Sequence, residues 1–128
     1  MTRVLAFGTF DRMHPGHVWF LQQAAALGDV LLVGVARDAH GLQLKNKRPH
    51  QKETERLASV CARPEVFEAH LCDEHLGSFE LINRFQPDLI ALGHDQDDLA
   101  QELHTWMARH GLCLPCVRIK KYETDQGT

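Results

Sequence analysis

The sequence lacks any apolar run that approaches the roughly 20 residues needed to cross a bilayer. Its first residues, MTRVLAFG, have neither the length nor the flanks of a signal peptide. It also lacks an excess of one charge, because 14 lysines and arginines stand against 17 aspartates and glutamates, for a formal net charge of -3. Such a chain has no global field to hold a polyanion such as DNA. We therefore expect a cytoplasmic protein that binds neither a membrane nor nucleic acid.

Cysteine is also scarce, with four residues in the chain. In the absence of an export signal their thiols are expected to stay reduced, so we predict no structural disulfide. Cys113 and Cys116 form one C-x-x-C pair, which can be redox-active or supply half of a zinc site. The pair falls in a predicted late strand, and no second C-x-x-C accompanies it. A metal or redox protein stays open as an alternative to simple packing of these thiols.

The overall composition is that of a globular protein. Hydrophobic residues make up 44% and charged residues 24% of the 128 residues. This length fits one domain and leaves little room for a second. We see no internal repeat, linker or low-complexity segment, and we predict a single domain over residues 1–128.

Short apolar runs alternate with segments of helical spacing along the whole chain. The pattern predicts strands at residues 3–7, 30–36, 66–70, 88–93 and 113–119, and helices at residues 17–27, 51–62, 76–85 and 97–110. Such alternation implies parallel βαβ units. We therefore predict an α/β fold with a Rossmann-like, doubly wound, five-stranded parallel sheet and helices on both faces. Ligands bind such sheets beyond the carboxyl ends of the strands, where the strand order reverses.

The stretch FGTFDRMHPGH, residues 7–17, lies at such a strand end and leads into the first helix. Pro15 suits the first position of a helix, where its missing N–H costs nothing. The unpaired backbone N–H groups and positive dipole end of that helix attract phosphate. His14 and His17 would project from one side of its first turn, and Gly16 would leave backbone room for a ligand. Two surface histidines or a partial metal site are the alternative for a His-x-x-His pair taken alone.

The segment GTFDRMHPGH resembles the signature of the HxGH nucleotidyltransferases, and in particular of their cytidylyltransferase-like group, in which G-T-F-D precedes H-x-G-H. The resemblance implies transfer of a nucleoside monophosphate from a triphosphate, ATP or CTP, to a small phosphate-bearing acceptor, with release of pyrophosphate. It also implies Mg²⁺ bound mainly through the triphosphate, without a metal site built of side chains, and a possible homodimer. The residues so implicated are His14 and His17 as catalytic groups, Gly8, Thr9, Phe10 and Gly16 at the nucleotide or phosphate, and Asp11 on the acceptor or metal side.

A second basic segment extends the resemblance. In LQLKNKRPHQKETERLA, Lys45 and Lys47 fall where glycerol-3-phosphate cytidylyltransferases carry a lysine pair, and Arg56 falls on their arginine in the following helix. The resemblance implies catalytic roles for Lys45 and Arg56 and a phosphate contact for Lys47. The same residues make a local basic loop at the carboxyl end of the sheet. A solvated charge run without a role is the alternative.

The segment ALGHDQ, residues 91–96, bears on the acceptor. It resembles the A-L-G-Y-D-Q segment of archaeal FAD synthases, with His94 in place of tyrosine. The resemblance implies FMN as acceptor and ATP as donor, with Asp95 and Gln96 at the nucleotide. CTP-dependent transfer to glycerol 3-phosphate, or to a similar small phosphate, is the alternative. Asp95 could also serve as a helix N-cap, because a helical run follows it.

One departure from the family pattern concerns the end of the sequence. Family members carry a serine and threonine-rich segment that opens another helix and helps to hold the triphosphate. This sequence stops at RIKKYETDQGT, without that segment or helix. The chain is therefore expected to be either cut before the motif or a shortened member. A nucleotide-binding module without turnover remains a further alternative.

Overall fold

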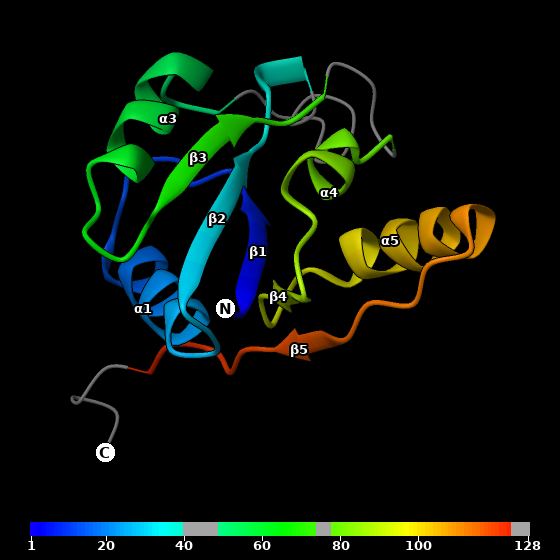
Figure 1. Cartoon of the computed structure of the whole chain (residues 1–128). Coiled ribbons are helices and arrows are strands. Elements are labelled where there is room, and N and C mark those ends of the chain that lie inside the picture. The colour runs from blue at the N-terminus through cyan, green and yellow to red at the C-terminus, as the bar shows by residue number, and fades with distance from the viewer. Residues whose placement is uncertain (40–48, 74–77, 124–128) are drawn as a thin grey trace.

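A parallel sheet lies at the centre of the computed structural model, which describes residues 1–39, 49–73 and 78–123. Within these residues the strand order is β3-β2-β1-β4-β5, and all neighbouring strands are parallel. β1 lies between β2 and β4, so the strand order reverses at β1 (Figure 1). The predicted doubly wound fold is confirmed. The elements are β1 (Arg3–Gly8), α1 (Pro15–Ala25), β2 (Val30–Val35), α3 (Glu53–Cys61), β3 (Glu68–Leu71), α4 (Glu80–Phe85), β4 (Leu89–Leu92), α5 (Asp97–His110) and β5 (Cys116–Arg118).

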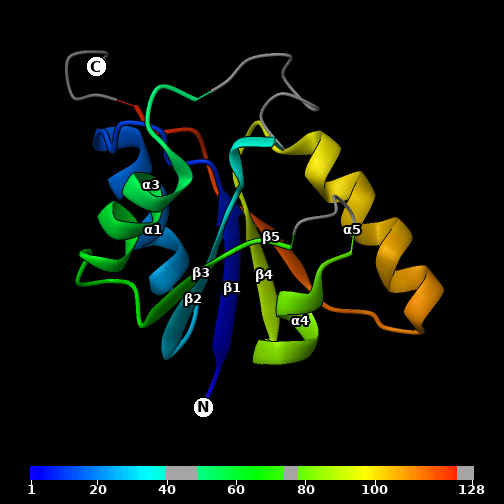
Figure 2. The ribbon, with the colours of Figure 1, turned by 90° about the horizontal axis from the view of Figure 1, so that it is seen from above.

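The central strands are apolar on both faces because helices cover the sheet on both sides. Along β1, Val4 and Ala6 point into a core shared with α1 and α3, where Leu21 and Val60 are fully buried. Leu5 and its neighbours on the other face belong to a second core with α4 and α5. Figure 2 shows the two helix pairs on opposite sides of the strands. The carboxyl ends of β1 and β4 therefore lie between two helical layers.

The helix α5 shows how the hydrophobic pattern fixes a helix face. Its buried residues recur at intervals of three and four, so one stripe faces the sheet. The helix ends at Gly111, whose φ of 66° is the left-handed conformation that glycine adopts freely. None of the described helices has the length and apolar character needed to span a membrane.

Two predicted elements begin at least three residues later than expected. The strand predicted over residues 113–119 covers only Cys116–Arg118, because Pro115 has no N–H to give to a β ladder. The helix predicted from residue 76 begins only at Glu80, because Phe79 has a left-handed backbone with φ of 44°. Asp73, just after β3, accepts hydrogen bonds from the Ser78 hydroxyl at 2.6 Å and from the Glu80 N–H at 2.7 Å. These bonds hold the start of α4 beside the end of β3.

Candidate active site

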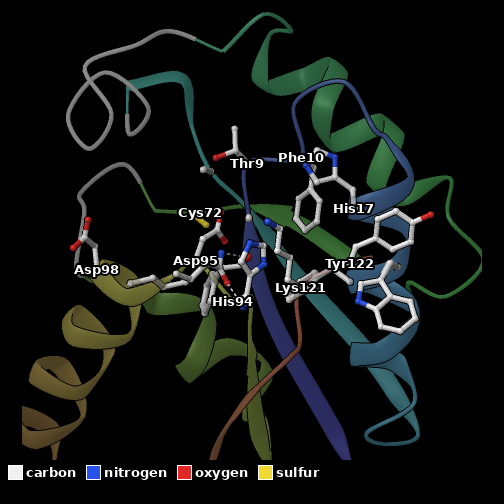
Figure 3. Close-up of a pocket in the computed structure, with 18 of the residues that line it drawn as sticks. Thr9, Phe10, His17, Cys72, His94, Asp95, Asp98, Lys121 and Tyr122 are labelled. Carbon is white, nitrogen blue, oxygen red and sulfur yellow. Dashed lines mark hydrogen bonds between the residues drawn. The ribbon is translucent and has the colours of Figure 1, made fainter. Parts of the chain in front are cut away.

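A cavity of about 970 Å³ opens at the carboxyl end of the sheet. Its walls come from the ends of β1, β3 and β4, the starts of α1 and α5, the residues around the start of α4, and the segment after β5. Figure 3 shows His17 and Tyr122 on one side, Cys72 and Asp98 on the other, and His94 and Lys121 between them. The cavity thus lies where the strand order reverses, as the sequence predicts.

His14 and His17 lie together in the wall of this cavity. His14 is the N-cap of α1, and its Nδ1 accepts a hydrogen bond of 3.1 Å from the Gly16 N–H. A neutral imidazole that accepts at Nδ1 carries its proton on Nε2, which leaves one N–H donor for a ligand. The two rings are stacked, with centroids 3.6 Å apart and 22° between their planes. An anion bound here would meet both imidazoles at once.

The two glycines of the motif make room for side chains. A Cβ at Gly16 would lie 2.9 Å from Cε1 of His14, so Gly16 accommodates the histidine ring. Gly16 also lines the cavity, and the backbone room for a ligand expected there stays a prediction. A Cβ at Gly8 would lie 2.7 Å from the ring of Phe10, which is buried and contacts His17 edge-on at 5.5 Å. Both glycines therefore help to position the two histidines. Gly8, Thr9, Phe10 and Gly16 all line the cavity.

Asp11 lies outside the cavity wall, and the acceptor or metal role that the resemblance implies for it stays a prediction. Its two carboxylate oxygens each accept a hydrogen bond of 2.9 Å from the backbone, one from the His50 N–H and one from the Gln51 N–H. Partial burial raises the pKa of this carboxyl, but the two hydrogen bonds and the nearby positive Arg56 bring it below its ordinary value. The described contacts give Asp11 the task of tying the β1–α1 turn to the residues before α3.

Arg56 is the only charged residue among the buried side chains of the described chain, and it too lies outside the cavity wall. Its side chain has no exposed surface. The guanidinium donates to the carbonyl oxygens of Thr9 and Ala36, both at 2.8 Å, and of Gln51 at 3.1 Å. It also pairs with Asp38 at 2.8 Å. These partners enclose the guanidinium and support a structural role, while the catalytic role that the resemblance implies for Arg56 stays a prediction.

Asp95 and Gln96, which follow β4, differ in their surroundings. Asp95 is exposed and lines the cavity. Gln96 lines it too, but its amide donates to the Phe7 carbonyl at 2.8 Å and accepts from the Gly93 N–H at 2.7 Å. Gln96 thereby joins the ends of β1 and β4, which leaves less of its amide for a nucleotide. The N-cap of α5 is Gln96, so the alternative of Asp95 as N-cap is wrong.

Lys45 and Lys47 lie outside the described residues, and their predicted catalytic and phosphate-binding roles stay predictions. Among the described residues, no three His, Cys, Asp or Glu side chains are grouped so that they could hold a metal ion. Cys113 is exposed, while Cys116 packs against the core on the α4–α5 side of the sheet. The zinc alternative therefore gains no support from the neighbours of this pair.

Comparison with known proteins places this site in a family. The model of the cytidylyltransferase-like family matches residues 5–114, which contain the two histidines and most of the cavity wall. The chain belongs to the cytidylyltransferase-like family. The family predicted from GTFDRMHPGH is therefore confirmed.

Three relatives illustrate this membership. Proteins named FAD synthase from Methanosarcina barkeri and Archaeoglobus profundus are 46% identical over 119 residues and 43% identical over 124 residues. The alignments cover 93% and 96% of this chain and 84% and 77% of those relatives. A solved structure from Thermoplasma volcanium, described as a lipopolysaccharide core biosynthesis protein, is 36% identical with a TM-score of 0.86. The structural match covers 96% of this chain and 99% of the Thermoplasma volcanium chain.

Several cavity residues of this cytidylyltransferase-like chain escaped the sequence-based reasoning. The segment after β5 contributes Lys120, Lys121 and Tyr122, and α1 contributes Trp19. The indole N–H of Trp19 donates to the Lys120 carbonyl at 3.2 Å, and its ring lies 6.0 Å from that of Tyr122. Figure 3 shows Lys121 entering the cavity from this segment. A signal existed, because residues that follow any strand of a parallel sheet meet at the same edge.

Cys72 provides a direct check on the polarity of the cavity. Burial raises the pKa of its thiol to about 12, and the neighbouring Asp73 carboxylate adds to the rise. About one such thiol in ten thousand is then ionised at pH 8, and the thiolate is the reactive form. We expect iodoacetamide at pH 8 to modify the exposed Cys61 and Cys113 well before Cys72, as measured by peptide mass spectrometry. In denaturant all four thiols should react at similar rates. Equal rates for Cys72 and Cys113 in the native protein would contradict the burial of the Cys72 thiol.

Proposed function

We propose that this protein is an FMN adenylyltransferase, which transfers AMP from ATP to FMN and forms FAD and pyrophosphate. The cavity, with its two histidines at the start of α1, carries the proposal, because it combines a phosphate site with room for two ring systems. Membership of the cytidylyltransferase-like family supports nucleotidyl transfer. The relatives named FAD synthase support FMN over other acceptors.

The reaction needs positioning and charge stabilisation more than covalent chemistry. An oxygen of the FMN phosphate attacks the α-phosphorus of ATP and forms a new P–O bond. The bond from the α-phosphorus to the oxygen that bridges to the β-phosphorus breaks, and that oxygen leaves with the pyrophosphate. Negative charge grows on the oxygens around the α-phosphorus and on the leaving group, so hydrogen-bond donors and cations near those atoms lower the barrier.

The cavity residues suit these tasks. His14, through its Nε2–H, and His17 donate to oxygens of the α-phosphate, and the start of α1 adds its positive dipole end. Lys121, which lines the cavity, is proposed to neutralise the leaving pyrophosphate. Lys45 and Lys47 remain proposed for phosphates of donor or acceptor. Thr9 and Asp95 are proposed to contact the nucleotide, and Asp95 does so from the end of β4.

Magnesium is the cofactor that the family implies. Mg²⁺ keeps several waters and is usually held by substrate phosphates with one or two carboxylates. Asp95 is a carboxylate in the cavity wall and could supply that small protein share. When bound, the ion would screen the charge of the triphosphate. The homodimer and the cytoplasmic location stay predictions.

Two other functions remain to be separated from this one. Transfer of CMP to glycerol 3-phosphate uses a small polar acceptor, and a cavity of about 970 Å³ with a partly apolar wall exceeds its needs. A nucleotide-binding module would fill the cavity without turnover.

One assay distinguishes the three functions. We expect ATP, FMN and Mg²⁺ to give FAD, detected by chromatography, with equimolar pyrophosphate, and we expect EDTA to abolish both products. CTP with glycerol 3-phosphate should give at most slight pyrophosphate release. Faster release with CTP would favour the cytidylyltransferase. Tight ATP binding without release under any acceptor would favour the binding module.

A further inference from the structure

The cavity has two aromatic sides that differ in charge. On the first side, Trp19 and Tyr122 lie close together, and Lys120 and Lys121 accompany them. On the second side, Phe79 is accompanied by three other apolar or neutral side chains. We call this second set the apolar wall: Phe79, Leu81, Leu99 and Cys72. The stacked histidines lie on the first side, toward Tyr122 (Figure 3), and Cys72 marks the second.

The charges near the two sides suggest which substrate each can accept. Asp73, Asp98 and Glu102 line the cavity near the apolar wall, on the elements that carry Cys72 and Leu99. Three carboxylates repel a triphosphate, whereas the flavin ring system of FMN is uncharged and has N–H and carbonyl groups along one edge. The two lysines on the other side attract a triphosphate. Charge therefore directs ATP to the Trp19 side and leaves the apolar wall for a neutral, flat ring.

The position of Phe79 supports this assignment. Its φ of 44° is unusual for an aromatic residue and costs free energy, and the hydrogen bonds from Ser78 and Glu80 to Asp73 hold it there. The ring packs edge-on against Phe7 at 5.7 Å and against Trp106 at 6.1 Å, with interplanar angles of 68° and 74°. Phe79 is only half-buried, and it lines the cavity. A strained backbone thus presents a fixed aromatic ring to a ligand.

We infer that the isoalloxazine ring of FMN packs on the apolar wall of Phe79, Leu81, Leu99 and Cys72, while its phosphate reaches the histidines and ATP lies along the Trp19 side. This inference rests on the proposed function, since it names the place of the acceptor within that site. The Cys72 thiol stays protonated against the flavin and acts as an apolar contact. Phe79 is accordingly a specificity residue for the acceptor.

The test compares two variants on opposite sides of the cavity. Phe79→Gly removes the ring and favours the left-handed backbone that position 79 requires, so the fold is expected to tolerate it. Tyr122→Ala removes a ring from the other side. FMN binding is measured by flavin fluorescence, with and without α,β-methylene-ATP, and KM values are measured for both substrates. Circular dichroism and thermal melting report the fold, and Leu99→Asn serves as a second variant of the apolar wall should Phe79→Gly not fold.

We expect Phe79→Gly to weaken FMN binding and to raise the KM for FMN about tenfold, with the KM for ATP nearly unchanged. Tyr122→Ala should do the reverse. FMN binding that is equal in the wild type and in Phe79→Gly, or no FMN binding by the wild type, would overturn the inference. So would a rise in the KM for FMN in Tyr122→Ala alone. FMN that binds through Phe79 without forming FAD would instead leave the inference standing and remove the proposed function.

Discussion

Replacement of His17 by alanine is expected to lower kcat for FAD formation about a hundredfold, which corresponds to about 3 kcal/mol of lost transition-state stabilisation. The imidazole of His17 lies in the cavity wall, stacked on His14 and contacted edge-on by Phe10. Its loss removes a donor at the α-phosphate and leaves the His14 ring without its stacking partner. KM for both substrates should change much less than kcat, because the donor is needed most as charge develops.

Two further variants make the measurement specific. His17→Gln places an amide N–H₂ group near the position of the imidazole Nε2, so we expect it to recover part of the lost rate. His104→Ala removes an exposed histidine of α5 that does not line the cavity, and its kcat should equal that of the wild type. Pyrophosphate release at nearly wild-type rate in His17→Ala, with the fold intact, would remove His17 from the mechanism.

The fold and the centre of the site could be predicted because their signals are local. The apolar runs of β1 and β2 form adjacent strands, with Val4 paired to Leu31. The His-x-x-His spacing across Pro15 is a property of one helix start, so it brings the two rings together whatever the rest of the chain does. The start of α4 was less predictable, because it depends on Asp73, which belongs to the preceding strand end.

The roles of Gln96 and Arg56 show what local patterns miss. The Gln96 amide donates a hydrogen bond to the Phe7 carbonyl, 89 residues away, and no spacing in the sequence predicts that contact. Arg56 was different, because a signal was present. Arg56 and Val60 are four residues apart and are both fully buried on α3, so the helical period already placed the arginine on the inward face. The charged and polar residues around Arg56, in the segment KETERLA, favoured an exposed cation instead.

The second large effect is expected at Arg56, where Arg56→Met should lower the free energy of unfolding by about 3–5 kcal/mol. Methionine fills part of the volume but donates no hydrogen bond. The carbonyl oxygens of Thr9, Ala36 and Gln51 would lose a donor inside the protein, and Asp38 would lose its cation. Groups left unpaired in this way carry their full desolvation cost. Urea denaturation followed by circular dichroism measures the change.

The partner residue provides the control. The Asp38 carboxylate is 32% exposed, and Asp38→Asn keeps an acceptor for the Arg56 guanidinium while removing only the charge. We expect this variant to lose about 1 kcal/mol. Arg56→Lys should lie near Arg56→Met, because one ammonium group cannot reach all the carbonyl oxygens that the planar guanidinium joins.

The same variants separate the two roles considered for Arg56. As a structural residue, Arg56 holds the Thr9 carbonyl, and Thr9 lines the cavity, so Arg56→Met should lower activity together with stability. If Arg56 were a phosphate ligand, its replacement would leave the free energy of unfolding almost unchanged and would raise the KM for ATP or FMN sharply. A variant that unfolds like the wild type but binds ATP far more weakly would therefore return Arg56 to the role that its family resemblance implies. Because the guanidinium is fully enclosed by protein oxygens, we expect the first of these outcomes.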